Sequence, residues 1–241
     1  MKYGLPKLAK SGEDVGFKTV SNAVYCADGR TAEDHFTELH NMKPVNIDVS
    51  NIRLGIMGDG IIFGTGLNDP STESFISLLG NHFTTCINYA KSGILLTYKT
   101  STNGTTHPSP ICIEYESMAN TLDVILIFLT TNDWYYSVPK GAITDTVNTT
   151  YYGALNNLII GLQNKYPNGN IFFITPTPRV DLTDENGNVL KSSDDKNSVG
   201  LTLRDYLDVV RETCEYHTVP VIDLFKNINM NIVHNKNHKL A

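Results

Sequence analysis

The sequence predicts a three-layer α/β domain in which a five-stranded parallel sheet lies between two layers of helices. From residue 50 onward, short apolar runs bounded by turn residues alternate with longer stretches of helical periodicity, and strands that alternate with helices pair in parallel. The length of 241 residues fits one large domain with a short extension. We therefore divide the chain into an N-terminal attachment or oligomerisation segment, residues 1–46, and an α/β domain, residues 47–241.

The N-terminal segment contains one predicted short helix. Thr31 and Asp34 approximate a capping box at its start, and Phe36, Leu39 and Met42 recur every three residues along it. One such stripe cannot form a core by itself. It packs either on the following domain or on another copy of the chain, and the second arrangement predicts a homo-oligomer.

The α/β domain contains five predicted strands and four predicted helices. The strands are the apolar runs Ile52–Met57, Cys86–Ala90, Asp123–Leu129, Asn170–Thr175 and Pro220–Phe225. The helices lie between them, near residues 71–82, 113–120, 151–165 and 201–216. The turn-rich stretch Asp181–Gly200 interrupts this alternation and predicts a β-hairpin inserted above the sheet.

Composition narrows the classes of partner. The chain has 25 acidic and 19 basic residues, a net charge of −6, and no Lys/Arg run, which argues against nucleic acid or an anionic membrane as a partner. Only 18% of residues are charged, while Asn and Thr recur throughout. Such a surface favours polar neutral material such as glycans, or another protein copy.

Cysteines and apolar runs indicate the compartment. The four cysteines are widely spaced with no C-x-x-C pair, so we expect buried or reduced thiols instead of a disulfide framework. The first residues contain no apolar run of signal-peptide length. The longest apolar stretch, Val124–Leu129, is too short to cross a bilayer. We expect a soluble protein, cytoplasmic at synthesis.

Glycines follow the first predicted strand, at the sheet edge where ligands of open α/β folds bind. Gly58 and Gly60 begin a dinucleotide-binding pattern, but Phe63 stands where the third glycine is needed, and no acidic residue follows the second strand. The glycines by themselves also fit a tight turn with no ligand. We expect no cofactor.

The segments after the first three strands carry a resemblance to a known family. They are Gly58-Asp59-Gly60, Asn88-Tyr89-Ala90-Lys91-Ser92-Gly93 and Thr130-Thr131-Asn132-Asp133. In order and placement they resemble the first three sequence blocks of the SGNH/GDSL hydrolase family, over about residues 50–235. The resemblance implies a flavodoxin-like α/β/α fold. It also implies three oxyanion-hole donors, the backbone N–H groups of Gly60 and Gly93 and the side-chain amide of Asn132.

The sequence departs from the family pattern at the reactive side chains. Gly60 stands where the family has its nucleophilic serine, and Ser92, on another strand end, does not replace it. The family's Asp-x-x-His is absent. Its nearest equivalent is Asn231 and His234 in the C-terminal tail, with an amide where the carboxylate should be. His234 also fits a solvated tail residue, and we expect Asp223, at the end of the last strand, to be structural.

Three explanations fit this pattern: natural loss of activity, engineered removal of the serine, and truncation of the last helix. Each predicts a chain that is catalytically impaired as written, because oxyanion donors without a nucleophile supply only part of the rate enhancement.

Other candidate binding residues surround the third block. Asp59, Asp133, Trp134 and Tyr135 are candidate ligand-binding residues, because aromatic rings at a pocket mouth stack on sugar faces. Core packing is the alternative for the aromatic residues. The acidic run near residues 184–188 lacks the oxygen ligands of a calcium loop, so we expect no metal.

The segment Asn22–Glu33 resembles attachment segments that precede SGNH-like domains in phage tail and baseplate proteins. We therefore expect a domain of a phage tail or host-surface-binding protein that binds cell-surface polysaccharide, with other virion proteins as partners. One alternative is a carbohydrate or lipid esterase, acting on a small acyl or acetyl ester and seen in an inactive or truncated form. Another is a purely structural assembly module.

Overall fold

The structure is a computed structural model that describes residues 48–99, 101–102, 105–129, 131–179, 182–183, 189–190 and 192–227. The predicted segment 1–46 and the tail residues Asn231 and His234 lie outside the described residues. No helix in the described part of the chain is long and apolar enough to cross a membrane.

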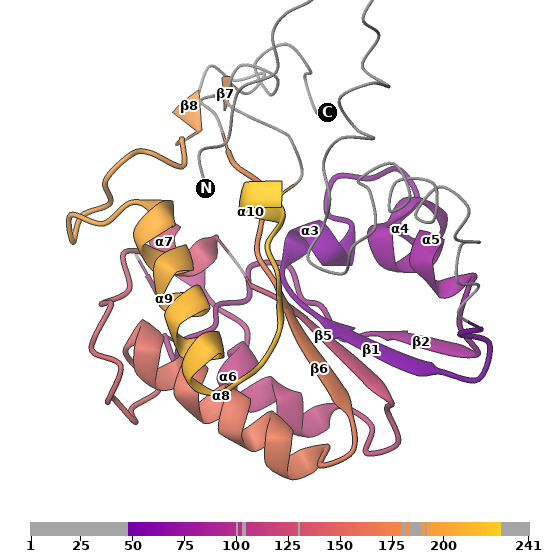
Figure 1. Cartoon of the computed structure of the whole chain (residues 1–241). Coiled ribbons are helices and arrows are strands. Elements are labelled where there is room, and N and C mark those ends of the chain that lie inside the picture. The colour runs from indigo at the N-terminus through magenta and orange to yellow at the C-terminus, as the bar shows by residue number, and fades with distance from the viewer. Residues whose placement is uncertain are drawn as a thin grey trace, which may run out of the picture. The chain divides into compact units, whose positions relative to one another are not determined.

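A parallel sheet of five strands forms the centre of the domain (Figure 1). The strands are β1 (Arg53–Met57), β2 (Thr85–Asn88), β5 (Val124–Phe128), β6 (Asn170–Ile174) and β9 (Val221–Ile222). Their spatial order is β2-β1-β5-β6-β9, and every neighbouring pair is parallel. The chain moves outward from β1 to β2 and then returns past β1 to β5, so the order reverses between β1 and β5. The predicted flavodoxin-like α/β class is confirmed.

Helices cover both faces of the sheet (Figure 1). One face carries α3 (Gly60–Phe63), α4 (Pro70–Glu73) and α5 (Phe75–Gly80), and the other carries α6 (Ile111–Glu114), the 3₁₀ helix η1 (Tyr115–Ser117), α7 (Asn132–Tyr135), α8 (Tyr151–Lys165) and α9 (Leu203–Tyr216). Successive strand residues therefore enter opposite cores: Ile56 and Phe128 pack in one, Met57 and Ile127 in the other. Burial on both faces explains why these strands read as unbroken apolar runs.

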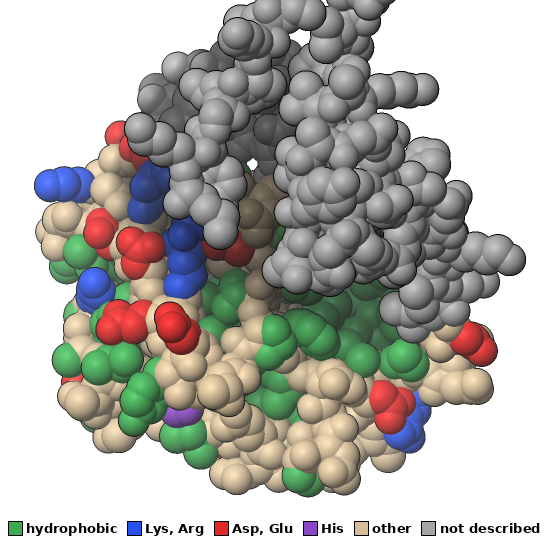
Figure 2. All heavy atoms as spheres, viewed as in Figure 1, with side chains coloured by type: hydrophobic (Ala, Val, Ile, Leu, Met, Phe, Trp, Pro, Cys, Tyr) green, Lys and Arg blue, Asp and Glu red, His purple; other side chains and the backbone are tan. Residues whose placement is uncertain are grey.

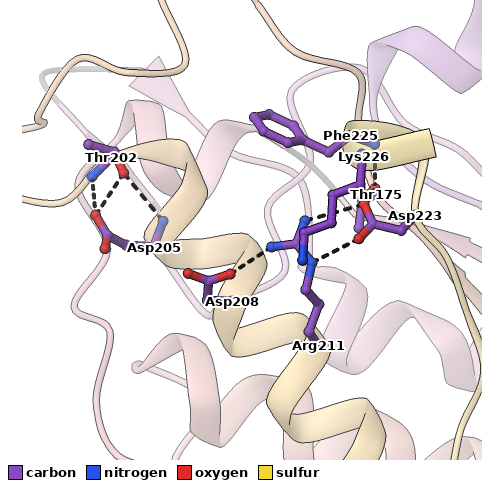
Figure 3. Close-up of polar contacts among 8 residues, drawn as sticks. All are labelled: Thr175, Thr202, Asp205, Asp208, Arg211, Asp223, Phe225 and Lys226. Atoms are coloured by element: carbon purple, nitrogen blue, oxygen red, sulfur yellow. Dashed lines mark hydrogen bonds and ion pairs between the residues drawn. The ribbon is translucent and has the colours of Figure 1, made fainter. Parts of the chain in front are cut away.

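The two long helices match their predicted ranges because side chains cap them. Thr150 accepts a hydrogen bond from the backbone N–H of Gly153 at the start of α8. At the start of α9, Thr202 and Asp205 form a reciprocal capping box, which Figure 3 shows.

Two predicted helices differ from the structure. The helix expected near 71–82 is divided into α4 and α5, because Ser74 has extended backbone angles and its hydroxyl caps α5. The helix expected near 113–120 begins earlier, at Ile111, and its second half is the 3₁₀ helix η1.

The last predicted strand is shorter than expected. Only Val221–Ile222 pairs with β6, and the chain then enters the short helix α10 (Leu224–Asn227). Asp223 turns the chain, because its carboxylate accepts the backbone N–H of Lys226 at 3.2 Å. The predicted hairpin is present as β7 (Leu182–Thr183) paired antiparallel with β8 (Val189–Leu190), and a second hairpin, β3 (Ser101–Thr102) with β4 (Thr105–Thr106), is an unpredicted element.

Candidate ligand-binding site

A cavity of about 480 Å³ lies at the carboxyl edge of the sheet, where the strand order reverses. Its walls come from the segments that follow β1, β2, β5 and β6. The residues that line the cavity are Asp59, Gly60, Ile61, Thr65, Ser92, Gly93, Thr131, Asn132, Pro176, Thr177 and Arg179. The structure thus brings Asp59, Gly60, Gly93 and Asn132, four of the residues predicted for the site, into one cavity.

The turn after β1 is shaped by Asp59 and Gly64. The side chain of Asp59, which is only 4% exposed, accepts the N–H of Ile61 at 3.0 Å and caps the short helix α3. Gly64 ends that helix with φ of 88°, a left-handed conformation that glycine adopts without strain. The backbone N–H of Thr65 then donates to the carbonyl of Gly60 at 2.8 Å. The turn therefore brings Thr65 back beside Gly60.

A pair of hydroxyl groups lies where a side chain at position 60 would extend. An ideal Cβ on Gly60 would be 2.9 Å from Thr65 Oγ1 and 3.4 Å from Ser92 Oγ. Thr65 Oγ1 in turn donates to Ser92 Oγ at 3.1 Å. Sequence reasoning missed Thr65 and set Ser92 aside because it follows another strand. No sequence pattern places Thr65 here, because it is brought beside Gly60 by the left-handed backbone at Gly64, which is a feature of the structure.

The loop after β2 is held by the loop after β5. Gly93 has φ of 76°, which only glycine adopts readily. The side-chain amide of Asn132 donates to the carbonyl of Ile94 at 2.7 Å. Next to it, the carboxylate of Asp133 accepts the backbone N–H groups of Leu96 and Thr97 at 2.8 and 3.1 Å. The two loops therefore form one hydrogen-bonded unit around the Gly93 and Asn132 positions.

Asp133 is fully buried, and burial raises its pKa to about 6. The hydrogen bonds from Leu96 and Thr97 act in the opposite direction and favour the ionised form. Asp133, which the sequence predicts as a ligand-binding residue, is buried and does not line the cavity, and its side chain holds the loop after β2.

His107 supports the same loop from a third segment. It is 7% exposed, its ring is hydrogen-bonded to the Gly93 backbone, and it packs edge-on against Tyr136 with 4.4 Å between ring centroids. Burial lowers the pKa of His107 below its ordinary value, so the ring is neutral at neutral pH.

Arg179 is the cationic group among the described residues of the cavity wall. Its backbone is fixed by Ser193, since Arg179 N donates to Ser193 Oγ at 2.6 Å and Ser193 N donates to Arg179 O at 3.2 Å. Burial lowers the pKa of Arg179, while the nearby charge of Asp59 raises it. Sequence reasoning missed this residue, although it follows the end of a predicted strand, where ligands bind.

The two aromatic residues predicted as ligand-binding residues differ in exposure. Trp134 is fully buried in the core, and its indole N–H donates to the carbonyl of Asp195 at 3.2 Å. Tyr135 is 47% exposed but does not line the cavity. The structure thus places Trp134 in the core and outside the cavity walls, as the core-packing alternative describes.

Asp223 lies at the same edge of the sheet, but its carboxylate is fully engaged (Figure 3). Arg211 donates to it through Nε at 2.8 Å and Nη2 at 3.2 Å, and Thr175 Oγ1 donates at 3.1 Å. Although burial alone would raise it, these bonds and the charge of Arg211 keep the pKa of Asp223 below its usual value. Asp223 is thus structural in this fold.

The described residues contain no group of three or more His, Cys, Asp or Glu side chains that could hold a metal ion. The described cysteines, Cys86, Cys112 and Cys214, are free thiols. Burial raises the pKa of Cys112 and of Cys214 to about 12, so neither is a reactive thiolate at neutral pH.

Comparisons with known proteins identify the fold. No family model and no curated protein matches the sequence. Among solved structures, a Lactobacillus plantarum protein superposes with a TM-score of 0.65 and 22% identity over 80% of this chain and 86% of its own. A candidate GDSL-like lipase from Bacteroides uniformis has a TM-score of 0.55 and 18% identity, over 75% of this chain and 86% of its own.

An acetyl xylan esterase, AlAXEase, has a TM-score of 0.50 and 16% identity, over 77% of this chain and 82% of its own. These likenesses, together with the strand order, show that the domain has the SGNH-hydrolase type of α/β fold. Identities at this level show the fold and do not transfer an activity.

Proposed function

We propose that this domain is a non-hydrolytic binding module that holds a saccharide, or an acyl group carried on one, in the cavity at the carboxyl edge of the sheet. The observation that carries the proposal is the hydroxyl pair of Thr65 and Ser92 beside Gly60. A glycine has no side-chain atom to acylate, and a Cβ added at this position would lie 2.9 Å from Thr65 Oγ1, so the Thr65 side chain would have to shift to admit a serine.

The polar groups of the cavity suit a saccharide. The resemblance assigns three donors to an oxyanion hole: the N–H groups of Gly60 and Gly93 and the amide of Asn132. Donors of this kind also bind a ground-state carbonyl or hydroxyl oxygen, and hydroxyl side chains such as Thr65 and Ser92 both donate and accept. In the view of Figure 2, uncharged side chains and backbone make up most of the described surface of the domain, and acidic and basic side chains lie in small neighbouring groups.

The biological setting in this proposal is a phage tail or another host-surface-binding assembly, with cell-surface polysaccharide as the ligand. This setting depends on the resemblance of Asn22–Glu33 to attachment segments and on the low fraction of charged residues, 18%. In the same proposal residues 1–46 attach the domain to other virion proteins or to further copies of the chain.

A second candidate function is hydrolysis of acyl or acetyl esters of carbohydrates. The fold shared with a candidate GDSL-like lipase and an acetyl xylan esterase favours it. In that case the nucleophile comes from a position other than 60. The hydroxyl groups of Thr65 and Ser92 are the nearest to that position among the described residues.

One experiment separates these candidates. The full chain is applied to a glycan array and assayed for release of acetate from acetylated xylan and of nitrophenol from p-nitrophenyl acetate. Ser92→Phe fills the cavity, and Ser198→Phe, at an exposed serine outside the cavity walls, is the matched control. We expect glycan binding that Ser92→Phe abolishes and Ser198→Phe retains, without turnover. Turnover that Ser92→Phe abolishes supports the esterase, and an array without a bound glycan contradicts the binding module.

A further inference from the structure

We propose that Arg179 makes the cavity selective for saccharides that carry an anionic group, either a carboxylate or a phosphate ester. This inference rests on the proposed function, because it specifies which saccharides the same cavity accepts. The residue lies in the segment after β6 and lines the cavity. No other Lys or Arg is among the described residues of the cavity wall.

The pairing of the described arginines distinguishes Arg179 from the others. Arg53 is paired with Asp123, Arg204 with Asp194, and Arg211 with both Asp208 and Asp223. Each of these guanidinium groups therefore has a carboxylate partner within the domain. Within the described residues Arg179 forms no ion pair.

The guanidinium group of Arg179 keeps most of its hydrogen-bonding capacity. It has five N–H donors, and among the described residues it makes one side-chain hydrogen bond, a long one of 3.4 Å from Nη1 to Thr131 Oγ1. A partly buried guanidinium whose donors lack hydrogen-bond acceptors is costly, and an anionic ligand would supply further acceptors. The planar fork suits the two oxygens of a carboxylate or phosphate.

The main chain of Arg179 is held by Ser193. Arg179 N donates to Ser193 Oγ, and Ser193 N donates to the carbonyl of Arg179. Ser193 is itself fully buried, and its carbonyl accepts the N–H of Leu203. The start of the side chain is therefore fixed, which reduces the conformational freedom that Arg179 loses on binding an anion.

Asp59 decides which kind of anion fits. It is the acidic residue among the described cavity walls, and its charge acts on Arg179. A carboxylate in the same wall repels a bare anion but accepts hydrogen bonds from hydroxyl groups. The pair of charges therefore favours a ligand that has hydroxyl donors on one side and an anionic group on the other, which is the chemistry of an acidic sugar.

The test is a calorimetric titration of the full chain with D-glucose, D-glucuronate and glucose 6-phosphate. We expect at least one acidic sugar to bind about tenfold or more tightly than glucose, the ratio typical of a hydrogen bond to a charged group. If only glucuronate binds more tightly than glucose, the site recognises a carboxylate. If only glucose 6-phosphate does, the site recognises a phosphate ester. A higher salt concentration is expected to weaken the binding of the acidic sugar and to leave the affinity for glucose unchanged.

Variants assign the preference to Arg179. Arg179→Gln is expected to remove the preference for acidic sugars over glucose, and Arg179→Lys is expected to retain part of this preference. The control Arg53→Gln, at the opposite edge of the sheet, is expected to retain all of it. A preference that survives Arg179→Gln overturns the inference. If that variant fails to fold, a preference insensitive to both Arg179→Lys and salt overturns it as well.

The outcomes also separate this inference from the proposed function. Glucose bound as tightly as both acidic sugars overturns the selectivity and leaves the binding module in place. Acidic sugars that bind while every array glycan fails support the anionic site and contradict polysaccharide binding. No binding of any sugar or glycan contradicts both.

Discussion

The carboxylate of Asp133 accepts hydrogen bonds from both the backbone N–H and the side-chain hydroxyl of Thr97, at 3.1 and 2.7 Å. This relationship joins the loop after β5 to the loop after β2. It places Gly93 and Asn132 in the wall of one cavity although they lie on different loops. A side chain outside the cavity walls thus helps to hold together the two loops that contribute to them.

Asp133→Asn is expected to destabilise the domain by about 1–3 kcal/mol, because an amide NH₂ would face one of the backbone donors that the carboxylate now accepts. Urea unfolding of both proteins measures the difference. Equal stability would contradict the role given to this carboxylate.

The unaltered protein and the Asp133→Asn variant also test the raised pKa of Asp133. The folded-state pKa of Asp133 is about 6 against an ordinary value of 3.8, so the folded protein binds the proton more tightly than the unfolded chain. Its contribution to stability is therefore complete below 3.8 and is lost as the pH rises through about 6. We expect the stability advantage of the unaltered protein over Asp133→Asn to fall between about pH 4 and about pH 7. An advantage that grows over this range would contradict the sign.

Gly60→Ala tests the crowding at the family's nucleophile position. The added Cβ would meet Thr65 Oγ1 at 2.9 Å, so Thr65 must rotate and lose its bond to Ser92. This cost offsets the gain in helix propensity of about 1 kcal/mol. In a double-mutant cycle with Thr65→Ala we expect a favourable coupling of about 0.5–1 kcal/mol. Strict additivity would show that Thr65 does not occupy this space.

The same crowding affects any attempt to install catalysis. Gly60→Ser with Asn231→Asp restores the family's residue types but leaves Thr65 in contact with the new side chain. We expect Thr65→Ala, added to these two changes, to give higher p-nitrophenyl acetate turnover than the double variant. Turnover in the double variant that Thr65→Ala does not raise would show that crowding is not the obstacle.

Arg211→Ala is expected to destabilise the domain by about 1–3 kcal/mol, because Asp223 would keep its partial burial without its main partner. The pKa of Asp223 lies below its ordinary value. The stability that this pair provides is therefore present above 3.8 and lost as the pH falls through the lower, folded-state pKa. Thermal unfolding at neutral and acidic pH measures both effects, and unchanged glycan affinity is the expected control.

Much of the fold could be predicted from the sequence because apolar periodicity and turn residues are local signals. The helix expected at 151–165 has the bounds of α8, and all five strands lie within or close to their predicted runs. The break at Ser74 and the turn at Asp223 involve side-chain hydrogen bonds, which hydrophobic patterns do not encode.

The site was less predictable. Gly60, Gly93 and Asn132 belong to sequence blocks with a family resemblance, so each could be assigned to the site in advance. Thr65 and Arg179 belong to no such block. They enter the cavity through a left-handed turn at Gly64 and through the bonds with Ser193, and these contacts between distant segments appear only in three dimensions.

A crystal structure of the full chain with the glycan that binds best on the array tests the central claim most directly. We predict that the sugar lies in the cavity after β1, β2, β5 and β6, with Asn132 and Arg179 within hydrogen-bonding distance and its glycosidic and ester bonds intact. A sugar bound on another surface, such as the exposed ring of Tyr135, would contradict the account, as would a hydrolysed ester in the cavity.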